Sequence, residues 1–168
     1  MTEKLMHFRF SQVKWLLFLS YFITLVLDSM NSLALLPVTL PSMTLLMLLI
    51  WTMLLQNKTH LFTALILGLL SDGIFNSVLG AHAILFSLLV FLLLRIRFSF
   101  RSYPLWQQTF IITLYFYAAK ILGFFLLQPV FNASNAYDYW LSPLLIIILW
   151  PVTLFIIKHQ CLKVASAP

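Results

Sequence analysis

The chain consists of long apolar runs separated by short polar segments. Each run contains roughly 20 residues, the length that an α-helix needs to cross a bilayer, and none alternates strictly between apolar and polar positions as a barrel strand does. The pattern therefore predicts membrane-spanning helices over residues 13–31, 38–56, 60–76, 79–95, 105–127 and 139–158. We expect one all-α membrane domain over residues 1–168, a compact bundle of six transmembrane helices.

Parity of the cationic clusters supports the count of six. The clusters are Lys4, Arg9 and Lys14; Lys58 and His60; Arg95, Arg97 and Arg101; and Lys158, His159 and Lys163. Cytoplasmic loops of membrane proteins collect Lys and Arg, so we place all four clusters and both termini in the cytoplasm. Each interval between clusters then needs an even number of crossings. The alternative has five helices, with residues 61–75 re-entrant and the C-terminus outside.

The middle interval is the shortest of the three. It leaves roughly 17 residues for each of the third and fourth helices, which is the lower limit for spanning a bilayer. The turn between these two helices must lie in GLLSDGIFNSVLGAHA, residues 68–83. Gly73 and Gly80 flank that turn, and we expect them to permit it.

Composition excludes a soluble globular domain. The chain is 62% hydrophobic and 8% charged, with a mean hydropathy of +1.03. Soluble domains are about 45–50% apolar and about 25% charged. The net charge of +6 then reflects cytoplasmic lysines and arginines that set the orientation in the membrane, and it does not indicate nucleic-acid binding. The single cysteine, Cys161, excludes an intramolecular disulfide, and we expect the N-terminal apolar run to be a retained helix rather than a cleaved signal peptide.

A few ionisable residues lie inside the apolar runs. Counted along their helices, Asp72, His82 and Lys120 lie about 20 Å from the cytoplasmic edge, and Asp28 is a fourth candidate at the end of the first helix. Charges in hydrocarbon are costly and usually pair inside the bundle. We therefore predict an ion pair between Asp72 and Lys120 with His82 close by.

This polar cluster has three possible roles. It can hold helices in register, which is the simplest interpretation, or it can bind a partner or a ligand. Acid–base catalysis is the least favoured role, because no nucleophile stands at a recognisable spacing from a base and an orienting group. The histidines show no metal-ligand spacing, so we expect neither a metal nor another cofactor.

Small residues recur beside the intramembrane charges. Ala64 and Gly68 lie on the same face of the third helix as Asp72, and Gly80, Ala83 and Ser87 lie on one face of the fourth. Ala119 and Gly123 lie on one face of the fifth helix, next to Lys120. Small faces let helices approach closely in lipid, where packing drives association. We therefore expect a compact centre around these helices.

The order of these features resembles the MreD family. An LP element precedes LLMLLIWTMLLQ, a short basic break follows, and then come GLLSDGIFNSVLGAHA, an arginine-rich loop RIRFSFRSYP and PLWQQ. MreD proteins are small polytopic rod-shape proteins of bacterial inner membranes. The most specific part of the resemblance is a GLLxD…LGxHA segment, matched here by Gly68, Asp72, Leu79, Gly80, His82 and Ala83.

The resemblance implies a function in cell shape. MreD-like proteins are non-enzymatic components of the elongation machinery that builds side-wall peptidoglycan, and they act with MreC, a bitopic periplasmic coiled-coil protein. The wider assembly contains MreB, RodA and a penicillin-binding transpeptidase. The arginine loop, Arg95, Arg97 and Arg101, then either reaches a cytoplasmic partner or anchors the topology against anionic lipid.

A second function remains open at this stage. Six helices and this length also resemble the substrate-binding S subunits of energy-coupling-factor importers, which bind vitamins. For that function the cluster around Asp72 is the ligand pocket.

Overall fold

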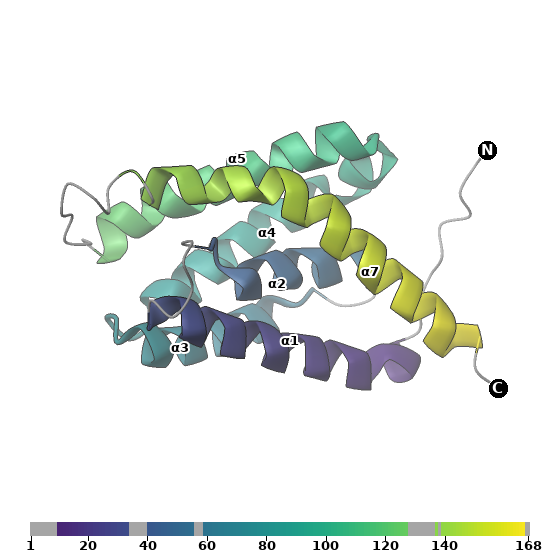
Figure 1. Ribbon diagram of the computed structural model, residues 1–168, viewed down its shortest axis with the longest axis horizontal. Coiled ribbons are helices and arrows are strands. Elements are labelled where there is room, and N and C mark those ends of the chain that lie inside the picture. The colour runs from purple at the N-terminus through teal and green to yellow at the C-terminus, as the bar shows by residue number, and fades with distance from the viewer. Residues whose placement is uncertain (1–9, 34–39, 56–58, 128–136, 138, 167–168) are drawn as a thin grey trace.

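The structure is a computed structural model, and it describes residues 10–33, 40–55, 59–127, 137 and 139–166. Every regular element in these residues is helical. The elements are α1 (Phe10–Ser32), α2 (Met43–Leu54), α3 (Leu61–Phe75), α4 (Ala81–Ser102), α5 (Leu105–Leu127), the 3₁₀ helix η1 (Ser142–Leu145) and α7 (Ile146–Ser166). Figure 1 shows α5 and α7 along one edge of the bundle, α1 along the other, and α2 and α4 between them.

Among the residues that the structure describes, four stretches are long and apolar enough to cross a membrane. They are Lys14–Ser32, Ala81–Ser102, Leu105–Leu126 and Tyr139–Cys161. The other two helices are shorter, since α2 has 12 residues and α3 has 15. Their lengths of about 18 Å and about 22 Å fall short of the hydrocarbon thickness of about 30 Å. The prediction of an all-α, multi-pass membrane protein is confirmed, while the expected long helix over 38–56 is replaced by the short α2.

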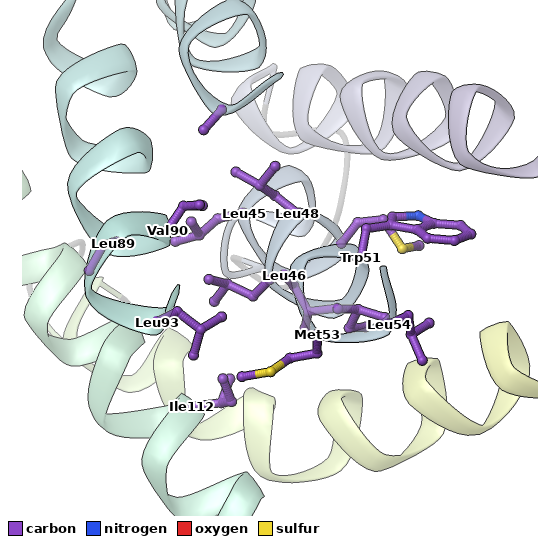
Figure 2. Packing of buried hydrophobic residues seen from close by; sticks show 14 of the residues in the cluster. Leu45, Leu46, Leu48, Trp51, Met53, Leu54, Leu89, Val90, Leu93 and Ile112 are labelled. Atoms are coloured by element: carbon purple, nitrogen blue, oxygen red, sulfur yellow. The ribbon is translucent and has the colours of Figure 1, made fainter. Parts of the chain in front are cut away.

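Helix α2 forms the core of the bundle. All 12 of its residues are buried, as expected for a helix that is apolar on every side. Figure 2 shows Leu46 and Met53 on the side of α2 that faces Leu93 of α4 and Ile112 of α5. Trp51 points toward α1, where its indole Nε1 donates a hydrogen bond of 2.8 Å to Ser20 Oγ. The other helices therefore pack around α2.

Both ends of α2 are capped by charged side chains from other helices. Asp28 of α1 accepts hydrogen bonds from the backbone N–H groups of Met43 at 2.8 Å and Thr44 at 3.0 Å. At the other end, Nη1 of Arg97 donates to the carbonyl oxygen of Thr52 at 3.4 Å. The anion thus meets the positive end of the helix dipole and the cation meets the negative end. These contacts satisfy backbone groups that a buried helix cannot expose to water.

The arginine-rich segment is helical, so the predicted basic loop over 95–101 is wrong. Helix α4 continues without interruption through Arg95, Arg97 and Arg101. It ends where Tyr103 adopts an extended conformation at φ −77° and ψ 147°. Pro104 follows directly, and a residue before proline is driven out of the helical region. Arginine is a good helix former, so nothing in the segment stops α4 earlier.

Helix α7 contains a proline in its interior. Pro151 lacks the N–H that would bond one turn back, and its ring crowds the preceding turn. Figure 1 shows α7 changing direction along its length, away from α5 and toward the N-terminal end of α1. The bend brings the last turns of α7 close to α1.

Candidate functional site

The turn between α3 and α4 contains a network of polar side chains. Helix α3 ends at Phe75, and Asn76 follows in the left-handed conformation at φ 51° with its N–H bonded to the carbonyl oxygen of Asp72. Gly80 then adopts φ +95°, where a side chain is disfavoured, and α4 starts at Ala81. Gly80 is therefore the residue whose conformational freedom the turn requires.

The carboxylate of Asp72 accepts hydrogen bonds from four donors around this turn. Oδ1 accepts from Ser77 Oγ at 2.9 Å, from the backbone N–H of His82 at 3.0 Å and from His82 Nδ1 at 2.7 Å. Oδ2 accepts from the backbone N–H of Gly80 at 2.7 Å. Asp72 is only 1% exposed. The chain's own donors therefore engage both oxygens of the carboxylate.

His82 is held in place by two aromatic rings as well as by Asp72. Its ring stacks on Phe75 at a centroid distance of 5.2 Å and meets Phe86 edge-on at 6.0 Å. The Nδ1 atom faces both the carboxylate and the Ser77 hydroxyl, which lies 3.2 Å away. In a Ser–His–Asp catalytic relay the serine and the aspartate contact different ring nitrogens. The arrangement here orients the imidazole but does not form that relay.

Close helix packing accompanies the polar network. A Cβ atom added at Gly68 of α3 would lie 2.3 Å from the Cα of Ala83 in α4, so only glycine fits at this crossing. Ala83 itself is 5% exposed. Gly73 differs from expectation, because it lies inside α3 and a Cβ added there meets nothing within 4 Å. The small faces of α3 and α4 therefore meet at Gly68 and Ala83, and Gly73 is not part of the contact.

The predicted ion pair between Asp72 and Lys120 is wrong. Within the described residues, the one ion pair that involves Asp72 is with His82. The ammonium nitrogen of Lys120 lies over the ring of Tyr139, 4.0 Å from its centroid, and the Tyr139 hydroxyl donates to the Lys120 carbonyl oxygen at 2.8 Å. Helix α3 packs mainly on α4, whereas α5 packs on α4 and α7. Equal depth along α3 and α5 therefore did not place the side chains of Asp72 and Lys120 beside each other.

Asp28 also lies outside the expected cluster, because it caps α2. Nearby, Asn31 donates from Nδ2 to the carbonyl oxygen of Leu40 at 2.9 Å and accepts from the Leu40 N–H at 3.1 Å. Ser42 donates to Asp28 at 3.2 Å and accepts from the N–H of Leu45 at 3.3 Å. The prediction from the sequence did not include Asn31 and Ser42 among the site residues. The position of Ser42 could have been predicted, because a serine directly before an apolar run is a signal for the start of a helix.

The remaining residues that were predicted for the site, Gly123 and the arginines of α4, lie away from the α3–α4 turn. Gly123 is buried in α5. Arg95 and Arg97 each lie beside an aromatic ring of their own helix, Phe91 and Phe98. No group of three or more metal-binding side chains occurs among the residues that the structure describes.

Comparisons with known proteins agree with the motif. A family model described as rod shape-determining protein MreD matches residues 9–159. The rod shape-determining protein MreD of Haemophilus influenzae is 29% identical over 127 residues, which cover 74% of this chain and 76% of that protein. No solved structure matches the chain. The chain therefore belongs to the MreD family of rod shape-determining membrane proteins.

Proposed function

We propose that the chain is a non-enzymatic component of the elongation machinery in the bacterial inner membrane, where it binds MreC and supports side-wall peptidoglycan synthesis. The observation that carries this proposal is the chemistry of the Asp72 network. The residues of the family-like segment are engaged in closing a turn and packing two helices. A buried carboxylate whose two oxygens both accept hydrogen bonds from the chain's own groups serves architecture, which favours a scaffold over an enzyme.

The proposed topology has six crossings with both termini in the cytoplasm. It is supported by the four full-length spans and by the basic residues at the end of α4 and near the end of α7. In this arrangement α2 and α3 cross as short helices, with the segments beside them completing the path. A C-terminal fusion tests it: green fluorescence without periplasmic phosphatase activity is expected, and phosphatase activity there contradicts the count.

Partner binding is proposed to use helix faces and short outer segments. Large apolar side chains on α1 face outward, with Trp15 76% exposed and Phe18 66% exposed. Such faces contact either lipid or another helix, and MreC is the partner we expect to meet this chain directly. MreB, RodA and a penicillin-binding transpeptidase complete the proposed assembly.

Two measurements test the function. Depletion in a rod-shaped host should produce round cells, and MreC should co-purify with the affinity-tagged chain. A matched comparison uses Gly68→Ala, which disturbs the α3–α4 contact, and Gly73→Ala, which does not. Normal rods after complete loss, together with no recovery of MreC, would contradict the proposal.

The importer-subunit alternative gains no support from the comparisons, which match the MreD family. The intended ligand pocket is also closed, because the chain's own donors occupy Asp72. Purified protein should therefore give flat binding curves against a vitamin panel.

A further inference from the structure

A narrow groove runs between α1 and α7, with α2 as its floor. Helix α1 supplies the wall from Leu16 to Leu27, α7 supplies the wall from Thr153 to Gln160, and α2 contributes Met43, Leu46 and Met47. The groove has a volume of about 260 Å³. Figure 1 shows α2 in the wedge between α1 and α7, which converge toward the C-terminal end of α7.

The walls of the groove are mostly apolar, and three hydroxyl groups also lie on them. Thr24 and Thr153 donate to backbone carbonyls of their own helices, and Ser20 donates to its own helix while it accepts from Trp51. The hydrogens of all three hydroxyls are therefore used within the chain. Gln160 differs, because its amide makes no hydrogen bond within the described part of the chain and its side chain is exposed. The groove therefore suits an apolar chain with a polar group at one end.

The length of the groove indicates what can occupy it. From Leu16 to Leu27, α1 rises by about 16 Å, which is about half of the hydrocarbon core and equals one leaflet. A groove that is one leaflet long matches the depth to which a lipid acyl chain reaches from the membrane surface.

The position of the groove in the bundle identifies its polar end. Lys14 begins the α1 span and Cys161 ends the span that contains α7, so Leu16 and Gln160 lie at a membrane surface. Along their helices, Lys14 stands two residues before Leu16 and Lys158 two residues before Gln160. Cations at the membrane surface attract anionic lipid headgroups. The lipid leaflet at this end therefore supplies both an acyl chain for the groove and an anionic headgroup that complements the two lysines.

We propose that the groove binds one acyl chain of an anionic phospholipid from the leaflet at the Lys14 end, with the Gln160 amide meeting the phosphate and ester oxygens. The bound chain fills the space between α1 and α7 and completes the packing around α2. This inference does not depend on the proposed role in cell elongation, and its test needs no cell-shape measurement.

Photo-crosslinking tests the site directly. The purified full-length protein is placed in nanodiscs that contain phosphatidylglycerol with a diazirine on its acyl chain, and the labelled residues are mapped by mass spectrometry. Labels should concentrate on the groove faces of α1 and α7. Ile156→Trp fills the groove and should reduce that labelling roughly tenfold, which corresponds to about 1.4 kcal/mol. The control Ile148→Trp makes the same change outside the groove on α7, at a residue that is 66% exposed, and should leave the labelling unchanged.

A second variant keeps the test decisive if Ile156→Trp does not fold. The double variant Lys14→Gln, Lys158→Gln leaves the groove open, removes both cations at this end and should abolish the preference for phosphatidylglycerol over phosphatidylcholine in competition labelling. Three outcomes would overturn the proposal: labels spread evenly over all exposed helix faces, groove labelling that neither variant changes, or, in native membranes, groove residues that crosslink to a polypeptide instead of a lipid.

Discussion

The Nδ1 atom of His82 lies 2.7 Å from Oδ1 of Asp72, across the turn that joins α3 to α4. The same carboxylate accepts the backbone N–H of His82 and that of Gly80, so one side chain bonds both the start of α4 and the residue before it. The turn and the packing of the two helices therefore depend on a single buried group.

Removal of this carboxylate should destabilise the hairpin strongly. Asp72→Ala leaves several donors, including His82 Nδ1 and the Gly80 N–H, without their acceptor and should cost about 1–3 kcal/mol or more. Asp72→Asn keeps one acceptor oxygen and should cost less. Thermal unfolding in detergent, followed by circular dichroism, measures both changes. A melting curve of Asp72→Ala that coincides with that of the wild type would rule out the network as a source of stability.

Two glycines in the same helix should respond in opposite ways to the same substitution. Gly68→Ala places a Cβ atom against the backbone of Ala83 and should destabilise the protein by about 1–3 kcal/mol or more, as overpacking does. Gly73→Ala meets open space inside a helix and should be neutral or stabilising by about 0.5–1 kcal/mol. The difference in melting temperature between the two variants is the measurement. Equal effects would contradict the close crossing of α3 and α4.

The cap at the start of α2 can be tested through amide exchange. Asp28→Ala removes the acceptor for the N–H groups of Met43 and Thr44 and should cost about 1–2 kcal/mol. Hydrogen–deuterium exchange should accelerate in the first turn of α2. Ser29→Ala is the control, because its side chain makes no hydrogen bond to α2 among the described residues. Unchanged protection in Asp28→Ala would show that α2 does not need this cap.

Substitution of the two arginines nearest the middle of α4 distinguishes the effect of capping α2 from the effect of losing a positive charge. Arg97→Ala removes the donor to the Thr52 carbonyl oxygen and a cation at the C-terminal end of α2, a loss of roughly 0.5–2 kcal/mol. Arg95→Ala removes the same charge from an exposed position over Phe91 and should cost less than about 1 kcal/mol. Melting temperatures compare the pair, and C-terminal reporter fusions should show the same topology for both. A larger loss in Arg95→Ala would exclude the capping role.

Much of the architecture could be predicted from the order of residues. The length of the apolar runs and the absence of alternation determine helices that cross a membrane, because only a helix satisfies its own backbone groups in hydrocarbon. The segment from Gly68 to Ala83 likewise located the α3–α4 turn, and it was the most specific part of a family resemblance that covers most of the chain. Six crossings with both termini inside remain a prediction.

The tertiary structure decided which polar groups meet. Asp72, His82 and Lys120 were predicted to share a depth, with Asp28 as a fourth candidate. Asp72 and His82 meet at the α3–α4 turn, whereas Lys120 contacts Tyr139 and Asp28 caps the start of α2. Position along a helix follows from counting residues, but neighbours and facing directions follow from how all the helices pack at once. Arg97 was expected in a loop, but it donates a hydrogen bond to the C-terminal end of α2. This role could not be predicted, because the last carbonyl groups of α2 need a donor only once the helix is buried. The sequence by itself thus determined the elements and their family, and packing around α2 determined their contacts.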